Sequence, residues 1–410
     1  MIHYHGRPGR MSTRRSRRLV SSAGVTRDAN DSFGVRLGRS WPIVVVTLLF
    51  LGGQGLLIWY NAGRRNVGKA VEERSEWDMG AWIRKRRQIA EGGDWLKTEL
   101  MTSGRKVVAF AVTITKDGHH MDGAAVLATS IYMACVQSMY LCDLVAFVHE
   151  DARKSGAILS QLGFRVMKMP LPVALSEIKD ERTREYVETG GCCGPAELLK
   201  LYSYTLTEYH RVVHLDTDTL VLRHFDELME SNASLLYTED VNMAGPKRSP
   251  VIPLQGGFMV VQPNKQVFED VLEVVRSTPF KRGLGWGSSK IGLFWGGITV
   301  QGLLPYFYES RGIREDWEAV DRCKYNNMVD TSTCRETDLE TIRSVHFTNC
   351  QKPWVCYYPH PKHQLCSRLF EQWYWMRKEA ERALGIPSAK ACVGVGERSY
   401  RPMKFDLLAQ

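Results

Sequence analysis

Apolar runs and stretches with helical spacing alternate through the central part of the chain. The β-branched run "KVVAFAVTIT" at 106–115 has the length of a buried strand, and "DLVAFVHE" at 143–150 is a second one. Between them, 122–139 carries apolar residues with helical spacing, and 156–170 indicates a helix followed by a short strand. This alternation predicts an α/β domain with a mainly parallel sheet flanked by helices.

A further helix and strand lead to a pair of aspartates. The helix is predicted to begin at Pro195, and apolar and aromatic residues between Leu198 and Tyr209 share one of its faces. The strand "RVVHL" at 211–215 follows, and Asp216 and Asp218 stand directly after it. Ligands of open parallel sheets bind beyond the carboxyl ends of the strands, so the two aspartates occupy a position where a site is expected.

A separate apolar stretch, "WPIVVVTLLFLGGQGLLIWY" at 41–60, contains no charge and is about as long as a membrane-spanning helix. Tryptophan lies at one end and Trp-Tyr at the other, where aromatic rings favour the headgroup level. A cleaved signal peptide is the nearest alternative, but its apolar part is usually shorter and closer to the start. We predict one transmembrane helix here.

The charge distribution predicts how the membrane helix is oriented. Residues 1–40 contain nine arginines against Asp28 and Asp31, so this short tail holds +7 of the net charge of +9. The rest of the chain is close to neutral, so the basic balance belongs to this tail and not to a nucleic-acid-binding face. Arginines beside a membrane helix stay cytoplasmic. We therefore predict a single-pass type II protein of the Golgi or endoplasmic reticulum, with the α/β domain lumenal.

Cysteine usage fits an oxidising compartment. The chain has ten cysteines and no C-x-x-C, so the spacing of a zinc ribbon is absent. Five of them crowd near the end of the domain, and some are expected to pair: Cys323, Cys334, Cys350, Cys356 and Cys366. The adjacent pair Cys192 and Cys193 is interpreted as structural. Asn232 opens an Asn-Ala-Ser glycosylation acceptor, and Asn30 opens a second one that should stay bare in the cytosol.

The two aspartates suggest a cation. Alternate residues of an extended segment point the same way, so Asp216 and Asp218 can present both carboxylates to one point. Two close anions raise each other's pKa unless a positive charge lies between them, and carboxylates suit Mg²⁺ or Mn²⁺. Asp-x-Asp alone fits a polar turn equally well. His346, a candidate third ligand close in sequence to Lys352, favours the metal.

Three segments resemble family 8 glycosyltransferases, the glycogenin-like group of retaining enzymes with a GT-A fold. "HLDTDTLVL" is similar to the aspartate motif of that family, and "HFTNCQKPW" to its closing motif. "VTITKDGHHMDGAAVLATS" resembles its nucleotide-binding opening. The resemblance covers 105 to about 357. Together with the tail and the apolar stretch described above, it predicts a cytoplasmic tail (1–40), a transmembrane helix (41–60), a stem (61–104), a GT-A catalytic domain (105–375) and a C-terminal extension (376–410).

The resemblance also implies site residues. Asp216, Asp218 and His346 would hold Mn²⁺, with Mg²⁺ possible, and the metal would grip the diphosphate of a UDP-sugar. The implied nucleotide-sugar contacts are Thr113, Thr115, Asp117, His120, Lys200, Asp216, Thr217, Asp218, Gln255, Gly256, Gln301, Asn349 and Lys352. The implied catalytic residues are Gln301, Lys352 and Asp218, since a metal and an ammonium stabilise the charge on the departing diphosphate. Lys200 alone fits a solvent-exposed position equally well.

Several positions depart from the family pattern. Asp117 replaces Asn, His120 replaces a stacking Tyr, Gln255 replaces Asn, Val300 replaces Asp and Asn349 replaces Gly. Val300 removes a hydrogen-bond acceptor, so a different preference for sugar or acceptor is expected. Gln301, which lies beneath the anomeric carbon in the family, is retained. No tyrosine lies between Asn326 and His346, which argues against a self-glucosylating glycogen primer.

Three functions follow as hypotheses. The first is a retaining, Mn²⁺-dependent glycosyltransferase that moves a hexose-type sugar from a UDP-sugar to a glycan or glycoconjugate. The second is a catalytically silent member that binds a nucleotide sugar or glycan. A glycoside hydrolase fits poorly, because its two carboxylates lie ~5–9.5 Å apart on opposite sides of the bond. The glycine-rich stretch 283–297 lacks a Gly-Lys-Ser/Thr motif, so it is interpreted as a loop beside donor or acceptor. Residues 370–384 are predicted to form a helix that packs its aromatics on the domain.

Overall fold

The computed structural model describes residues 80–83, 103–118, 120–243, 249–312, 316–358 and 363–405. These residues belong to one compact unit, Val71–Gln410. The predicted tail, the predicted transmembrane helix and most of the predicted stem lie outside the described residues. Among the described helices, none combines the length and the apolar character needed to span a bilayer.

The elements alternate between strands and helices as expected. The described strands are β1 (Val107–Ile114), β2 (Leu141–Val148), β3 (Arg165–Lys168), β4 (Arg211–Leu215), β5 (Thr219–Val221), β6 (Leu235–Glu239), β7 (Leu254–Val261), β8 (Phe280–Lys281), β9 (Gly285–Trp286), β10 (Trp317–Ala319) and β11 (Ser344–His346). The described α-helices are α4 (Met121–Cys135), α5 (Arg153–Gln161), α6 (Glu181–Thr189), α7 (Asp226–Met229), α8 (Lys265–Ser277), α9 (Val300–Arg311), α10 (Arg322–Tyr325), α11 (Ser332–Glu336) and α12 (Gln364–Leu384). The described 3₁₀ helices are η2 (Glu150–Ala152), η3 (Leu175–Glu177), η4 (Gly194–Thr205), η6 (Pro353–Val355) and η7 (Glu397–Ser399).

A seven-stranded sheet forms the centre, with the order β10-β6-β7-β4-β1-β2-β3. β1 is parallel to β2 and β4, β2 is parallel to β3, and β6 is parallel to β10. β7 runs antiparallel to both of its neighbours, β4 and β6. The predicted α/β architecture with a mainly parallel sheet is confirmed. The chain adds β2 and β3 on one side of β1 and then returns to place β4 on the other, which makes β1 and β4 the switch point of the topology.

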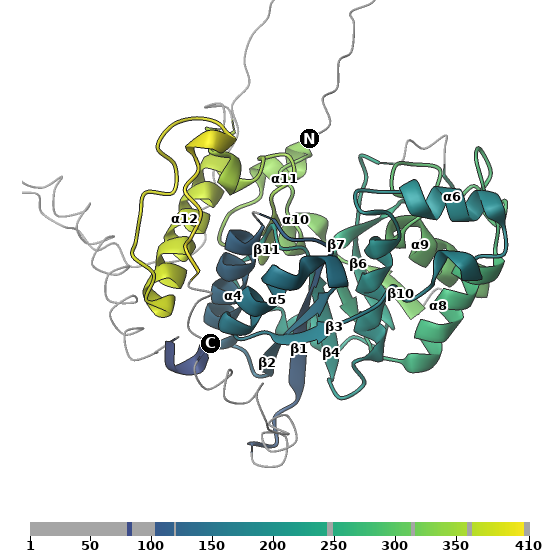
Figure 1. Ribbon diagram of the computed structural model, residues 1–410, viewed down its shortest axis with the longest axis horizontal. Coiled ribbons are helices and arrows are strands. Elements are labelled where there is room, and N and C mark those ends of the chain that lie inside the picture. Colours follow the sequence, from purple (N-terminus) through teal and green to yellow (C-terminus); the bar gives the residue numbers. More distant parts are fainter. Residues whose placement is uncertain are drawn as a thin grey trace, which may run out of the picture. The chain divides into compact units, whose positions relative to one another are not determined.

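Both faces of the sheet are covered, which explains the continuous apolar run of β1. Val107, Ala109 and Ala111 pack into one core cluster with residues of η4, α8 and α9. The alternate residues, including Val108 and Phe110, pack into a second cluster with α4 and α5. Figure 1 shows α4 and α5 apart from α8 and α9, with the strands between them. A strand buried on both faces needs apolar side chains at every position.

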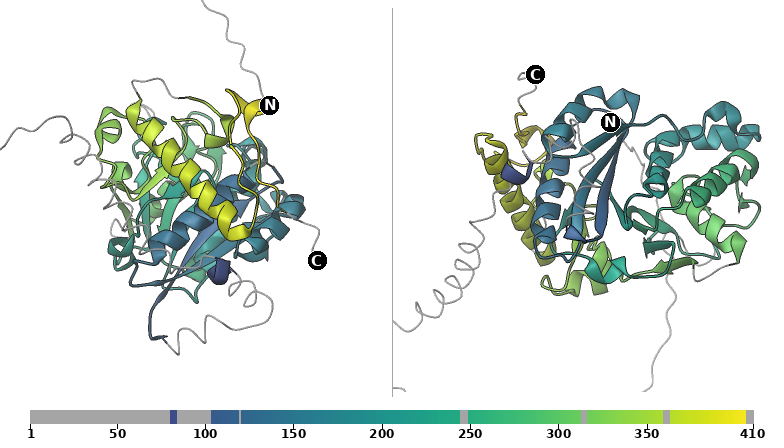
Figure 2. Two further views of the ribbon diagram at one scale, coloured as in Figure 1. Left: turned by 90° about the vertical axis from the view of Figure 1, so that its left-hand side faces the viewer. Right: turned by 90° about the horizontal axis from the view of Figure 1, so that it is seen from below.

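Helix α4 lies in the interior, between the sheet and α12. Val126 of α4 belongs to a third core cluster, together with Leu369 and Trp373 of α12. A helix that is apolar on all sides is one that is buried on all sides. Figure 2 shows α12 running across the outside of the domain. The prediction that 370–384 packs its aromatics on the domain is confirmed, although α12 begins earlier and crosses the boundary predicted at residue 375.

The predicted α-helix at 195–209 is instead the 3₁₀ helix η4, Gly194–Thr205. A 3₁₀ helix has three residues per turn, so Glu197, Lys200 and Ser203 form a single row. Lys200 Nζ lies 2.8 Å from Asp216 Oδ1, and Ser203 Oγ lies 3.0 Å from His214 Nδ1. The period of three therefore points both polar side chains at the end of β4, which an α-helical period would not do.

Eight cysteines form four disulfides: Cys135–Cys142, Cys323–Cys334, Cys350–Cys366 and Cys356–Cys392. The predicted pairing near the end of the domain is confirmed. Two of these bonds tie the segment 350–356, which carries Lys352, to α12 and to Cys392. Cys192 and Cys193 form no disulfide.

Candidate functional site

The two aspartates lie at the switch point of the sheet. Asp216 follows β4 and Asp218 precedes β5, and a tight turn joins the two strands because Thr219 N donates to Asp216 O over 3.0 Å. Asp216 N donates in turn to the carbonyl of Gly257 on β7 over 3.2 Å. Backbone hydrogen bonds thus fix both aspartates at the carboxyl end of β4, where ligands of such sheets bind.

His346 reaches the aspartates through a second, two-stranded sheet. β5 pairs antiparallel with β11, and the register places His346 opposite Thr219. Phe347 N donates to the carbonyl of Asp218 over 3.0 Å, which extends this pairing by one residue. Strand pairing therefore brings a segment that is distant in the sequence to the aspartates.

We call Asp216, Asp218 and His346 the metal-ligand cluster. His346 Nε2 lies 3.1 Å from Asp218 Oδ1 and 4.0 Å from Asp216 Oδ2. One ligand atom of each residue lies within 4.8 Å of those of the other two, a spacing at which one ion can contact all three. Two carboxylates and an imidazole form a donor set that suits Mn²⁺, and the carboxylates suit Mg²⁺. The structure brings together the three residues that the sequence predicted as ligands.

The close approach of the cluster to β7 requires a glycine. A Cβ on Gly257 would lie 2.5 Å from His346 Cε1 and 2.9 Å from Asp216 Oδ2, distances that real Cβ atoms do not adopt. His346 is 4% exposed, and its Nδ1 has no hydrogen-bond partner among the described residues. Packing against Gly257 and the pairing of β11 therefore hold the imidazole in place.

Each aspartate of the cluster is paired with one lysine. Lys200 Nζ lies 2.8 Å from Asp216 Oδ1 and donates to the carbonyl of Gly256 over 3.0 Å. Lys352 Nζ forms an ion pair with Asp218 Oδ2. Lys200 is only 8% exposed, so the solvent-exposed interpretation of this residue is wrong. Two ammonium groups therefore border the two carboxylates.

The pairing fixes the charges of these groups. Burial alone would raise the pKa of the Asp218 carboxyl, but His346 and Lys352 outweigh it and hold the pKa well below its usual range. Burial alone would lower the pKa of Lys200, but Asp216 and Glu197 outweigh it and raise the pKa above its ordinary value. At neutral pH the carboxylate is therefore anionic and the amine cationic.

Sequence reasoning missed Glu197 and His214, which surround Lys200. Glu197 Oε2 lies 3.6 Å from Lys200 Nζ. His214 is fully buried, and its ring nitrogens lie 3.3 Å from Thr113 Oγ1 and 3.0 Å from Ser203 Oγ. Burial and then the charge of Lys200 lower the pKa of His214 to about 3, so the imidazole is neutral. The sequence did contain a signal for His214, because a histidine is unusual in a strand that is expected to be buried on both faces.

The nucleotide-binding opening places its residues in different surroundings. Thr113 lies at the end of β1 and contacts His214, and the side chain of Thr115 lies beside Cys193. The Asp117 carboxylate accepts hydrogen bonds from Ser155 N and Ser155 Oγ, at 2.8 and 2.7 Å. Burial alone would raise the pKa of Asp117, but these hydrogen bonds outweigh it and lower the pKa. This carboxylate therefore caps the start of α5.

His120 occupies the N-cap position of α4, although its side chain makes no capping hydrogen bond. A Cβ on Gly118 would lie 3.0 Å from His120 Nδ1, so the imidazole lies over the preceding turn. Thr217 lies between the two aspartates, and a Cβ on Gly123 in α4 would lie 2.5 Å from its carbonyl oxygen. The first turn of α4 therefore approaches the aspartate turn closely.

We call Gln255, Gly256, Val300 and Gln301 the α9 edge. Val300 is fully buried in a core cluster, and Gln301 stands in the first turn of α9. A Cβ on Gly256 would lie 3.3 Å from the side chains of both Val300 and Gln301 and 3.5 Å from Lys200 Nζ. The α9 edge therefore lies beside Lys200.

The Gln255 side chain of the α9 edge forms hydrogen bonds with other groups of the protein. Gly257 N donates to Gln255 Oε1 over 2.6 Å, and Asn326 Nδ2 donates to the same oxygen over 3.3 Å. The glycine-rich stretch 283–297 reaches the same edge, since a Cβ on Gly296 would lie 3.5 Å from Gln301 Oε1. The interpretation of this stretch as a loop beside the site fits that position.

The segment with Asn349 and Lys352 is a rigid turn. Asn349 is exposed, and Gln351 N donates to Thr348 O over 3.2 Å. Gln351 has a φ of 66°, a left-handed backbone that few non-glycine residues adopt. The disulfides of Cys350 and Cys356 flank Lys352 on both sides. These constraints hold the ammonium beside Asp218.

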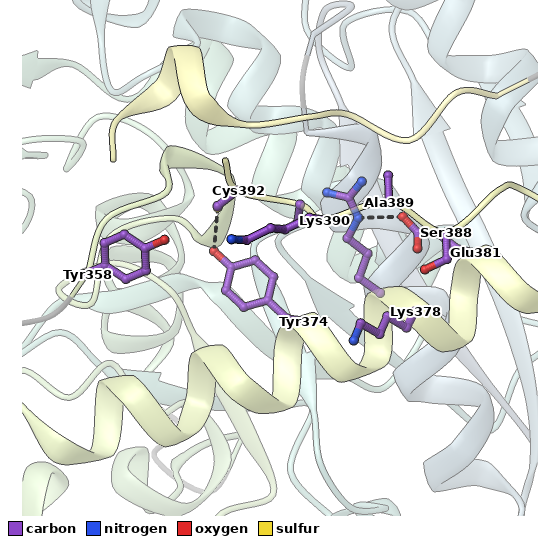
Figure 3. A pocket seen from close by; sticks show the side chains of 10 residues that line it. Tyr358, Tyr374, Lys378, Glu381, Ser388, Ala389, Lys390 and Cys392 are labelled. Atoms are coloured by element: carbon purple, nitrogen blue, oxygen red, sulfur yellow. Dashed lines mark hydrogen bonds and ion pairs between the residues drawn. The ribbon is translucent and has the colours of Figure 1, made fainter. Parts of the chain in front are cut away.

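A separate cavity of about 490 Å³ lies between α12 and the segment 388–392. Figure 3 shows Tyr374, Lys378 and Lys390 around it. None of the predicted site residues lines this cavity. Tyr374 Oη nevertheless donates to the carbonyl of Pro353 over 2.8 Å, directly after Lys352. One wall of the cavity therefore supports the Lys352 segment.

Comparison with known proteins gives several relatives, although no family model matches the chain. Rabbit (Oryctolagus cuniculus) glycogenin-1 is 23% identical over 255 residues, which cover 59% of this chain and 64% of that protein. An Arabidopsis thaliana protein whose name marks it as a candidate UDP-glucuronate:xylan alpha-glucuronosyltransferase 3 is 22% identical over 266 residues, covering 64% of this chain and 37% of that protein. Among solved structures, apo mouse xyloside xylosyltransferase 1 aligns with a TM-score of 0.38 and 12% identity, covering 60% of this chain and 99% of that one.

The curated relatives are named as glycogenin and glucuronosyltransferases, and the chain is homologous to them. The predicted resemblance to the glycogenin-like group is confirmed by these matches. The chain spans less than two thirds of the length of each of these relatives.

Proposed function

We propose that the chain is a retaining, Mn²⁺-dependent glycosyltransferase that moves a hexose-type sugar from a UDP-sugar to a glycan or glycoconjugate. The observation that carries this proposal is the metal-ligand cluster at the switch point of the sheet, with one lysine on each carboxylate. Homology to glycogenin and to glucuronosyltransferases supports the same reaction class.

Asp216, Asp218 and His346 would hold the metal, which when bound neutralises the diphosphate as it leaves the sugar. Lys352 places a positive charge beside Asp218, and its segment is fixed by disulfides on both sides. A charge that is already positioned stabilises a developing anion without reorganisation during the reaction. We therefore assign Lys352 to the leaving diphosphate.

The nucleoside is assigned to the carboxyl end of β1. Thr113 and Thr115 lie there, next to β4 and its aspartates, and His120 places an aromatic ring at the start of α4. An imidazole can stack on a base as the family tyrosine does. Asp117 caps α5 in this structure, so we expect it to act by holding the β1–α4 turn.

Retention of the anomeric configuration is explained by attack of the acceptor hydroxyl on the same face of the sugar from which the diphosphate leaves. Asp216 is bound to Lys200, and Asp218 is bound to Lys352 and His346, so neither carboxylate is a free nucleophile. The acceptor hydroxyl then transfers its proton to the departing phosphate oxygen. Gln301, at the first turn of α9 beside Lys200, is assigned to the positive charge that develops at the anomeric carbon.

The α9 edge supports a second candidate function, a catalytically silent protein that binds a nucleotide sugar. Val300 is buried in the core and offers no acceptor, and Gln255 Oε1 already accepts two hydrogen bonds within the protein. A site with this edge could bind the diphosphate without positioning the sugar for transfer.

We also propose a type II arrangement in the Golgi or endoplasmic reticulum, with the described domain lumenal. Four disulfides fit an oxidising compartment, and Asn232, the glycosylation acceptor, is exposed. A protease-protection experiment on sealed microsomes tests this arrangement, because a lumenal domain is shielded from added protease. Digestion of the domain while the microsomes are intact would refute it.

The function is tested by incubating the full-length protein with Mn²⁺ and a panel of UDP-sugars that includes glucose, glucuronic acid, xylose and galactose. We expect metal-dependent release of UDP from one donor, and its loss after chelation by EDTA. Binding of UDP with no release from any donor, across a panel of glycan acceptors, would support the silent function. Release of sugar from a glycan without any nucleotide would refute both.

A further inference from the structure

Cys192 and Cys193 are the two described cysteines that form no disulfide, although the other eight are all paired. They lie in the loop between α6 and η4, where Cys192 is exposed and Cys193 is partly exposed. Their sulfur atoms are 2.8 Å apart. The two thiols therefore face one another at the surface, which the interpretation of this pair as structural did not anticipate.

Covalent geometry explains why this pair differs from the others. Disulfides usually join residues whose Cα atoms are about 4.4–6.8 Å apart, and the four disulfides of this protein span 4.7 to 6.2 Å. Adjacent residues have Cα atoms only ~3.8 Å apart. A bond between Cys192 and Cys193 would therefore be strained, and strained, exposed disulfides are the ones that are easily reduced.

The two cysteines lie between two glycines with left-handed backbone. Gly191 and Gly194 flank the two cysteines with φ values of 62° and 58°, a region that glycine adopts without strain. A Cβ on Gly191 would lie 3.2 Å from the Thr299 side chain, directly before α9. The loop thus rests against the start of the helix that carries Gln301.

A chain of contacts leads from the pair to the metal-ligand cluster. Cys192 Sγ lies 2.7 Å from Glu197 Oε1, and Glu197 Oε2 lies 3.6 Å from Lys200 Nζ. Lys200 Nζ lies 2.8 Å from Asp216 Oδ1. On the other side, Cys193 lies beside the side chain of Thr115, a residue that the family resemblance assigns to the nucleotide.

We propose that Cys192 and Cys193 form a redox-active vicinal dithiol, which a small-molecule disulfide oxidises and whose state reaches Asp216 through Glu197 and Lys200. The modification site itself does not depend on the proposed transferase activity. Its effect on nucleotide binding does rest on that proposed function.

The step is a pair of thiol–disulfide exchanges. The Cys193 thiolate attacks one sulfur of the small disulfide, forms a mixed disulfide and releases one thiolate. Cys192 then loses its proton, and its sulfur attacks Cys193 Sγ and releases the second thiolate. Two protein thiols are oxidised, and one small disulfide is reduced to two thiols. The proton of Cys192 is donated to the carboxylate of Glu197, which leaves Cys193 as the thiol that ionises and attacks.

Oxidation removes the S–H proton that Cys192 offers to Glu197. Glu197 then loses one hydrogen-bond donor, and its carboxylate interacts more strongly with Lys200. Because Lys200 also forms an ion pair with Asp216, Glu197 and Asp216 compete for the same ammonium group. A hydrogen bond to a charged group is worth roughly a tenfold change in an equilibrium constant or more. We therefore expect the oxidised protein to bind UDP about tenfold more weakly than the reduced protein.

The modification is tested by equilibrating the full-length protein with glutathione and glutathione disulfide at a series of ratios. Free thiols are alkylated under denaturing conditions, and the peptides are mapped by mass spectrometry. We expect the peptide with Cys192 and Cys193 to pass from doubly alkylated to an internal disulfide within this series, while the other four disulfides stay intact. A peptide that stays doubly alkylated at every ratio, or that only carries glutathione, would overturn the dithiol.

Transmission is tested in the same samples by hydrogen–deuterium exchange of η4, a readout that needs no nucleotide. We expect faster exchange of η4 after oxidation in the wild type. We expect no difference in Cys192→Ser, whose thermal unfolding is compared with the wild type to confirm that it folds. Equal exchange of η4 in the two redox states of the wild type would overturn transmission.

Titration with UDP adds the functional arm. If UDP binds equally well in both redox states, the prediction that oxidation weakens nucleotide binding is wrong. If UDP binds in neither state, the proposed function fails, while the peptide map and the exchange of η4 still decide the dithiol and its transmission.

Discussion

The metal-ligand cluster and the α9 edge both lie beside Lys200 and are built in different ways. Backbone pairing positions the cluster, since Asp216 bonds to β7 and His346 lies in β11 opposite Thr219. Side-chain packing positions the α9 edge, where Val300 is buried and Gln255 bonds to its own strand. The first region concentrates charge, and the second carries apolar and amide groups.

This difference suggests a division of work between the two regions. A diphosphate and a metal carry the same charge whatever sugar is attached, so the residues that bind them need a fixed geometry. The sugar varies between enzymes, and it is recognised by side chains that can be exchanged without disturbing strand pairing. We therefore expect changes in the cluster to abolish the reaction, and changes in the α9 edge to alter its rate or its donor.

The largest effect is expected from Asp218→Asn. The amide keeps the shape of the carboxylate but removes the charge that Lys352 and His346 share. Metal-dependent UDP release should fall by about 1000-fold, measured under saturating donor. The matched control is Asp151→Asn, an exposed aspartate whose ion pair is with His149, which should leave UDP release unchanged. Retention of more than a tenth of the activity in Asp218→Asn would contradict the role of the cluster.

A smaller loss is expected from Gly257→Ala, which changes no charge. The new methyl group would overlap the His346 ring and the Asp216 carboxylate and displace both. A displacement of about 1 Å costs roughly 100-fold in rate, and overpacking costs about 1–3 kcal/mol of unfolding free energy. UDP release and guanidinium unfolding measure the two effects.

Gly156→Ala in α5 is the matched control for this change, because its Cβ would lie 3.7 Å from Val166, an ordinary contact. Alanine is favoured over glycine within a helix. The control should therefore keep both activity and stability. Equal behaviour of the two variants would show that the close approach at Gly257 is unimportant.

An effect on rate alone is expected from Gln301→Ala on the α9 edge. Loss of the amide should reduce turnover about tenfold through weaker stabilisation of the anomeric carbon. The affinity for UDP should stay the same, because the diphosphate contacts lie in the cluster. Steady-state kinetics and calorimetric titration with UDP separate the two quantities. A drop in UDP affinity as large as the drop in turnover would remove the proposed division.

The smallest effect concerns stability and the buried His214 behind the cluster. Its pKa of about 3 lies below the ordinary value of about 6.5, so the unfolded state binds more protons between these limits. Its contribution is complete above pH 6.5 and is lost as the pH falls towards 3. Between pH 7 and pH 6 we expect a loss of about 0.7 kcal/mol in unfolding free energy. Guanidinium unfolding should show a smaller loss in His214→Asn, and an equal loss would refute the assignment.

The sequence predicted those parts of the molecule that depend on local pattern. The run around Val107 needed apolar residues at every position because β1 is buried on both faces, and the prediction of a buried strand followed directly. The helix at Pro195 was predicted with the wrong period, since the bonds from Lys200 and Ser203 to the end of β4 are tertiary contacts that favour three residues per turn. Glu197 and His214 were missed for the same reason.

The pattern of residue types was enough to predict the α/β alternation, the position of Asp216 and Asp218 at the end of a strand, and His346 and Lys352 as further residues of the candidate site. Those features follow from the spacing of side chains along the chain and from motif resemblance. Three features are visible only in the folded protein: Lys200 is buried against Asp216, Gly257 permits the approach of His346, and Cys192 and Cys193 form no disulfide. Each of these depends on the separation of atoms from different strands and loops, and a linear pattern of residue types does not contain those distances.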